Sequence, residues 1–134
     1  MTTTVSVSTA TRNAQADALA RHLDGGFIKI YSGTVPATAD TALSGNTMLA
    51  SLPLQPTSAP AASSGTLTFD ITGVTDSSID NSGIASFYRT FKSDGTTVVT
   101  QGLVGTSGYS MTLSDINLIG SGTVTVTNFT HTVN

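Results

Sequence analysis

Hydroxyl side chains supply most of the polar surface that this chain can build, and they limit the folds open to it. Threonine and serine account for 42 of the 134 residues (25 and 17), charged residues make up 10%, and glutamate and cysteine are absent. Threonine is β-branched and suits a half-exposed strand. We therefore expect a mainly β scaffold or surface protein. An enzyme is the least favoured class, because active sites need several ionisable groups brought together.

Charge and hydropathy argue against further classes of function. The net charge is −3, with a pI near 4.8, which argues against binding to nucleic acid. The five basic residues are scattered: Arg12, Arg21, Lys29, Arg89 and Lys92. Without cysteine there is no disulfide or thiolate metal site. No apolar run approaches the ~18 residues of a membrane span. The first eleven residues lack the pattern of a signal peptide, so we expect synthesis in the cytoplasm and no membrane partner.

One helix is expected, over residues 10–24. Thr9 or Thr11 is a suitable N-cap, and alanine gives the segment high helix propensity. Asp24 and the two glycines that follow it favour a stop. The apolar positions form one narrow stripe, which suits packing on a sheet; they are Ala16, Leu19, Ala20 and Leu23.

The rest of the chain has the pattern of strands. They are expected over residues 27–31, 47–52, 67–71, 84–92, 96–101, 110–119 and 123–133. Ser93-Asp94-Gly95 predicts a hairpin turn, and a change of alternation in the last strand predicts a bulge near Thr127-Asn128. Phe87 and Phe91 fall on the opposite face from Tyr88, so we expect both faces of that strand to be partly covered. The expected core comprises Phe69, Phe87, Phe91, Leu67, Ile71, Ile28, Ile30, Val126 and Phe129.

These elements predict a single domain over residues 10–134, preceded by an N-terminal arm at 1–9. Its expected fold is an antiparallel β-sandwich or jelly-roll-like barrel with one short N-terminal α-helix. The arm alternates Thr or Ser with Val, which fits either a frayed tail or a strand that pairs with another surface. Residues 53–65 are rich in Pro, Ser and Ala. We interpret them as an extended loop or arm crossing a neighbouring surface rather than as a linker between domains.

Residue types that carry catalysis are few, and their spacing is unfavourable. His22 and His131 lack the spacing of metal motifs, so structural roles are expected for both. The string Gly105 to Gly108 (GTSG) does not match the nucleophile elbow of a serine hydrolase. Together with Gly102 it also fails as a dinucleotide fingerprint, because no helix pattern follows. The sequence therefore predicts no catalytic residues and no cofactor.

The aspartates offer one cluster of oxygen ligands, between Thr75 and Gly83. Asp76, Asp80 and Asn81 could contribute to a calcium site, but the order of an EF-hand loop is missing and there is no glutamate. An Asx-type turn explains the same residues, so no metal is expected. Asp70 and Asp115 lie in separate predicted strands and do not make an acid–base pair.

Two stretches together resemble a family of small virion-associated proteins of tailed bacteriophages and prophages. The first, Leu23 to Leu54, contains G-G-x-I-x-I-Y-x-G-x-x-P-A-x-A-D-T-A-L over Gly25 to Leu43. The second, Ala85 to Val133, contains the F-x-x-D-G hairpin at Phe91 to Gly95 and an alternating Val/Thr strand from Thr123. The resemblance covers most of the chain, apart from the tail and residues 53–65.

The resemblance implies a phage structural role, most specifically that of a head decoration (cement) protein. It brings no catalytic residues. The implied partners are the major capsid protein and further copies of the chain, as a homotrimer in proteins of this kind, and the implied location is the surface of the phage head. Thr2 to Thr9 and Pro53 to Gly65 are the two candidate arms for gripping a neighbour by strand addition.

Two alternatives remain open at this point. A tail or tail-tip component would share the same composition. A carbohydrate-binding β-sandwich would need exposed aromatic side chains, and this chain has no Trp and three tyrosines. Of these, Tyr109 is the candidate for stacking on a sugar.

Overall fold

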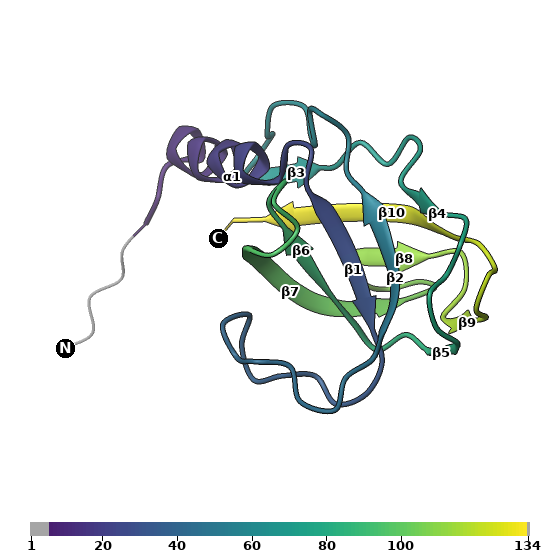
Figure 1. The fold of residues 1–134 in the computed structure, drawn as a ribbon. Helices are drawn as coiled ribbons and strands as arrows, with labels where there is room; N and C mark the ends of the chain where they lie inside the picture. Colours follow the sequence, from purple (N-terminus) through teal and green to yellow (C-terminus); the bar gives the residue numbers. More distant parts are fainter. Residues whose placement is uncertain (1–5, 134) are drawn as a thin grey trace.

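Strands dominate the computed structural model of the chain, which describes residues 6–133. Within them the chain forms one α-helix and ten strands (Figure 1). This confirms the predicted fold class. In chain order the elements are α1 (Thr9–Leu23), β1 (Phe27–Tyr31), β2 (Met48–Pro53), β3 (Thr66–Thr68), β4 (Thr75–Asp76), β5 (Gly83–Ile84), β6 (Phe87–Phe91), β7 (Val98–Gly105), β8 (Met111–Leu113), β9 (Asn117–Leu118) and β10 (Val124–Thr132).

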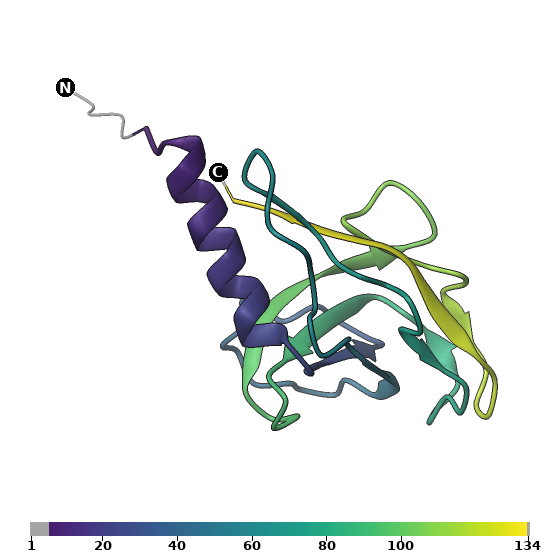
Figure 2. The ribbon, with the colours of Figure 1, turned by 90° about the horizontal axis from the view of Figure 1, so that it is seen from above.

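The main sheet curls into a half-barrel. Its strand order is β2-β1-β6-β7-β8-β10-β3, and β4 pairs with the end of β10 opposite to the end that pairs with β3. Neighbours are antiparallel except β7 and β8, which run parallel. β5 and β9 form a separate two-stranded ribbon. Figure 2 shows α1 lying along one side of the curled sheet, away from that ribbon.

Residues 76–81 bring the two ends of the curled sheet together. The Asp76 carboxylate (Oδ2) accepts a hydrogen bond of 3.0 Å from the backbone N–H of Ser51 in β2. The Asp80 N–H donates to the Leu49 carbonyl at 2.8 Å. The edge of β2 is thus satisfied by a side chain and a turn, where a further strand would otherwise pair.

Threonine pairs connect neighbouring strands across the sheet, which explains the composition of the chain. Hydroxyl-to-hydroxyl hydrogen bonds of this kind are a recognised form of cross-strand stabilisation. They link β10 to three neighbours and β6 to β7. The pairs are Thr66–Thr132, Thr75–Thr125, Thr112–Thr127 and Thr90–Thr100.

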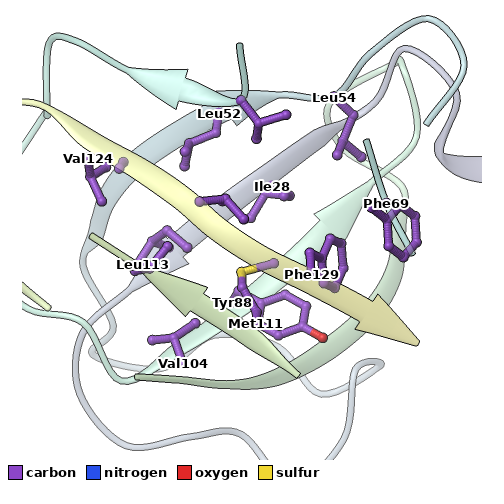
Figure 3. Close-up of a cluster of buried hydrophobic side chains, with 14 of the residues drawn as sticks. Ile28, Leu52, Leu54, Phe69, Tyr88, Val104, Met111, Leu113, Val124 and Phe129 are labelled. Carbon is purple, nitrogen blue, oxygen red and sulfur yellow. The ribbon is translucent and has the colours of Figure 1, made fainter. Parts of the chain in front are cut away.

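Apolar side chains fill the interior of the half-barrel (Figure 3). Phe69 and Phe129 stack with ring centroids 4.2 Å apart, and the ring of Tyr88 meets Phe129 edge-on at 5.5 Å. Eight of the nine predicted core residues are buried, and Ile71 is the exception, since it is only partly buried. Alternation therefore identified buried positions, although two of them, Phe87 and Phe91, face away from the interior.

Strand β6 is covered on both faces, as its sequence predicted. All five of its residues are buried. On the face opposite to Tyr88, the Phe87 ring stacks on Tyr31 at 5.2 Å, and the Lys29 ammonium lies 4.6 Å from the centre of the Phe91 ring. Phe87 and Phe91 are thus buried outside the half-barrel and not in its interior.

Helix α1 is one residue out of step with the predicted range. Its N-cap is Ser8, with extended backbone, whose hydroxyl accepts from the Thr11 N–H at 3.2 Å. The prediction of Thr9 or Thr11 as the N-cap was wrong, because Ser8, the residue before Thr9, has a hydroxyl group that accepts the same kind of hydrogen bond. Ala16, Ala20 and Leu23 are buried as predicted. Gly25 follows with a φ of 65°, which suits a glycine at the end of a helix.

Residues 53–65 form an extended loop that lies along the chain's own helix and do not form a free arm. The buried Ser58 hydroxyl donates to the Ala20 carbonyl at 2.8 Å. Three helix side chains accept hydrogen bonds of 2.8 Å from backbone N–H groups of this segment; the pairs are Asp24–Ser58, Asp17–Ala62 and Asn13–Gly65. The helix gives an otherwise patternless segment its hydrogen-bond partners.

Turns and irregularities match the local sequence signals. Gly95 has a φ of 73° in the hairpin between β6 and β7. The register of β10 on β8 shifts between Val126 and Asn128, where the bulge was predicted. Three predicted strands are shorter or broken. Residues 69–71 leave the ladder after β3, residues 85–86 separate β5 from β6, and residues 114–116 separate β8 from β9. The N-terminal arm is described only from residue 6, so residues 1–5 of that prediction lie outside the described part.

Candidate functional site

A pocket of about 340 Å³ opens between β7 and β10. It lies where β8 does not reach, since β8 pairs with β7 only at Val104 and Gly105. We call it the seam pocket. Its lining residues come from β6, β7, the loop before β8 and β10, and they are Tyr88, Gln101, Gly102, Leu103, Tyr109, Ser110, Thr130, His131 and Thr132.

Two glycines on β7 make room for the aromatic rings of the pocket. A Cβ at Gly102 would come within 2.7 Å of the Tyr88 side chain, and a Cβ at Gly105 within 2.4 Å of the Tyr109 ring. Glycine is therefore required at both positions if the rings keep their places. Tyr109 remains 46% exposed and Leu103 50% exposed, which leaves apolar surface at the pocket.

Burial disfavours the charged forms of two ionisable groups of the pocket, His131 and Tyr88. Burial lowers the pKa of His131 below its ordinary value of 6.5. Burial also raises the pKa of Tyr88, although a hydrogen bond with Thr100 opposes the shift. Among the described residues, those that line the pocket include no carboxylate. The pocket offers hydroxyl, imidazole and main-chain groups for binding, and not a pair of groups for acid–base chemistry.

The outer face of the sheet holds a buried cation that sequence reasoning missed. Arg89 is 4% exposed and lies on β6 between Phe87 and Phe91. Its guanidinium donates to the carbonyls of Thr38 and Thr41 and to the Gln101 side chain. The Gln101 amide in turn donates to the Pro36 carbonyl at 2.9 Å. Arg89 thereby fixes residues 36–41 on the sheet. The sequence contained one indication of this burial: Arg89 lies on the same face of the strand as Phe87 and Phe91, which were predicted to be buried.

Two of the three residues considered as calcium ligands, Asp76 and Asn81, bind backbone groups through their side chains. Asp76 accepts from the Ser78 N–H at 2.8 Å through its second oxygen, which is the Asx turn that the sequence favoured. The Asn81 amide donates to the Met48 carbonyl at 2.9 Å. No group of three histidine, cysteine, aspartate or glutamate side chains within residues 6–133 is placed to hold a metal ion.

The remaining candidates lie apart from one another. His22 is exposed in the last turn of α1, whereas His131 is half-buried in the seam pocket. Asp70 and Asp115 each accept a 3.0 Å hydrogen bond from an N–H two residues later, at Thr72 and Asn117. Of the residues that the sequence singled out, Tyr109 and His131 meet in the seam pocket, together with Gly102.

No protein-family model, curated protein or solved structure matches this chain. Within the described residues, no helix combines the length and the apolar character needed to cross a membrane.

Proposed function

We propose that this chain is a non-enzymatic structural protein of a tailed bacteriophage that decorates the outside of the head shell and stabilises the joints between capsomers. The observation that carries the proposal is the use made of its carboxylates. Six of the eight aspartates accept hydrogen bonds from the chain's own backbone N–H groups; they are Asp17, Asp24, Asp70, Asp76, Asp94 and Asp115. Ionisable groups committed to the backbone favour a rigid body over a catalyst.

The low charge of the chain also supports this role. Copies on a shell crowd side by side, and like charges would repel one another. A net charge of −3 over 134 residues keeps that repulsion small, and a surface of hydroxyl groups remains well hydrated without it. Many weak contacts, repeated over a symmetric shell, then sum to firm attachment.

The ribbon of β5 and β9 provides an apolar contact surface at the end of the molecule far from α1 (Figure 2). Ile84 is 62% exposed and Ile119 is 71% exposed. Ile84 pairs with Asn117, and Ile119 follows directly after β9, so both isoleucines lie at this end of the molecule. Two large exposed isoleucines at one end suit contact with another protein.

Quantitative mass spectrometry of purified particles, with heads and tails separated, tests the assignment. We expect the protein in the head fraction, at a copy number near that of the major shell protein. Recovery with the tails, in few copies, would instead favour a tail or tail-tip component. Absence from particles would overturn the virion assignment and favour the carbohydrate-binding alternative, which Tyr109 in the seam pocket supports.

Substitution of the two isoleucines tests the contact surface. Ile84→Ser combined with Ile119→Ser should lower occupancy on heads by about tenfold or more, a loss of ~1.4 kcal/mol or more in binding free energy. Leu43→Ser is the matched control, because Leu43 is 40% exposed and lies outside the ribbon. Equal occupancy of the double variant and the control would show that another face meets the shell.

A further inference from the structure

At the seam pocket, β7 and β10 each have a stretch of backbone edge that no strand among the described residues pairs with. From Val98 to Leu103, β7 pairs with β6, and it pairs with β8 only from Val104 onward. From Thr130 to Thr132, β10 pairs with β3, whereas β8 pairs with it only as far as Phe129. Between these two edges lies the seam pocket.

Where β8 lies between them, β7 and β10 leave room for one strand. Neighbouring strands lie about 4.8 Å apart, so β7 and β10 are separated by about 9.6 Å where β8 lies between them. Past the start of β8, at Ser110, β7 and β10 continue but no strand lies between them. A strand entering there would continue the line of β8 and find backbone on both sides.

The direction of the backbone bonds on β10 fits an incoming strand. The Thr130 N–H points towards the seam, where it donates to the Ser110 carbonyl at 2.9 Å, whereas the Val133 N–H points the other way and donates to Gly65 at 2.8 Å. Because backbone groups alternate in direction along a strand, the N–H and C=O of Thr132 face the open seam. An incoming strand would satisfy them.

The chain itself contains a segment suited to this place. Residues 2–7 read Thr-Thr-Thr-Val-Ser-Val, which are β-formers without charge or proline. Residues 1–5 lie outside the described part of the chain. Residues 6–8 lead away from the half-barrel in both views (Figures 1 and 2). Residues 6–8, the described part of this segment, therefore do not enter the seam of their own chain.

We infer that the seam between β7 and β10 is an acceptor site for residues 2–7 of a second copy of this chain, which add there as a strand. Strand addition of this kind obtains its affinity from main-chain hydrogen bonds. Exchange of identical segments between copies gives a closed, symmetric assembly. The inference concerns assembly of the chain with itself and goes beyond its proposed role on the phage head.

Engineered cysteines test the inference in the full-length chain, which has none of its own. Thr132→Cys is combined with Thr3→Cys in one variant and with Thr4→Cys in another. Adjacent tail positions point to opposite faces of a strand, so one of the two variants should form a disulfide between chains much faster than the other. The control pairs Thr4→Cys with Ser77→Cys, an exposed position in the turn after β4.

Each outcome decides the inference. A rapid disulfide between chains in one seam variant, absent from the control, supports it. A disulfide within one chain would show that the tail fills its own seam, and rates no higher than the control would show that the seam does not bind the tail; either result overturns the inference.

Oligomeric mass gives a second measurement that does not depend on cysteine geometry. Thr4→Pro combined with Ser6→Pro removes backbone N–H groups from the tail and should convert the assembly to monomers in light scattering. Thr4→Ala combined with Ser6→Ala keeps those N–H groups and should stay assembled. A monomeric wild-type chain, or equal assembly of the proline and alanine variants, would overturn the inference.

Discussion

The interior of the half-barrel and the contact between α1 and residues 53–65 are both ordered, but different interactions hold them. The interior consists of apolar side chains in contact, such as Phe69 stacked on Phe129. The helix contact also has buried apolar side chains, among them Ala20 of α1 and Ala59 of the segment, but it adds single polar atoms, since Asp17 and Asp24 each accept from one backbone N–H of the segment. Packing volume alone defines the interior, whereas the helix contact also depends on the position of individual oxygens.

This difference predicts different responses to mutation. An apolar interior tolerates exchange of one side chain for another of similar volume. A hydrogen-bonded contact tolerates a change of volume but not the loss of an acceptor, because the N–H that remains is left without a partner. The pKa of Asp24 shows the strength of these hydrogen bonds. Burial alone would raise this pKa, but hydrogen bonds from Arg21 and Ser58 lower it below 3.8.

The largest effect is expected in the interior. Phe69→Ala should lower the free energy of unfolding by ~3–5 kcal/mol, because it leaves a cavity beside Phe129. Ile71→Ala is the control, since Ile71 is only partly buried and should cost less. Chemical denaturation measures both, and an unchanged midpoint for Phe69→Ala would show that this side chain is not part of the packed interior.

The helix contact should respond to the loss of one oxygen. Asp17→Ala should cost about 1–2 kcal/mol, because the Ala62 N–H loses its acceptor. Asp17→Asn has nearly the same shape and keeps an oxygen in that position, so it should cost much less. Hydrogen exchange at Ala62 reports the contact directly; equal exchange in the two variants would mean that volume matters there and the acceptor does not.

The smallest effect is local and depends on pH. Hydrogen bonds from Thr97 and Thr96 lower the pKa of Asp94 to about 2 from 3.8. Because the folded pKa is depressed, the stabilisation is fully present above pH 3.8 and is lost as the pH falls through about 2. Hydrogen exchange at Thr96 and Thr97 should therefore accelerate over that range. Asp94→Asn does not titrate, so the same acceleration in that variant would contradict the assignment.

Local sequence patterns predicted the features that depend on a few neighbouring residues. The Asp94-Gly95 turn follows from one dipeptide, and the bulge near Asn128 follows from a change of parity within β10. The inward positions of Phe69 and Phe129 follow from alternation in the same way. Such features need no knowledge of what lies across the sheet.

Long-range arrangements could not be predicted, because their partners carry no shared local signal. The parallel pairing of β7 and β8 depends on how residues 106–110 fold back. The docking of residues 53–65 depends on helix side chains far away in the sequence. The seam pocket arises from the short length of β8, and the isolated pattern of residues 110–119 predicted a longer strand.

Arg89 couples the opening of the surface loop at residues 36–41 to the unfolding of the main sheet. Its guanidinium is buried, and the carbonyls of Thr38 and Thr41 are among its partners. Lifting residues 36–41 away would leave the charge buried with fewer partners, at a high cost in free energy. Although this loop lies at the surface, a protease should cut it only when the molecule unfolds globally. Its rate of cleavage would then report global stability and not fraying of a loop.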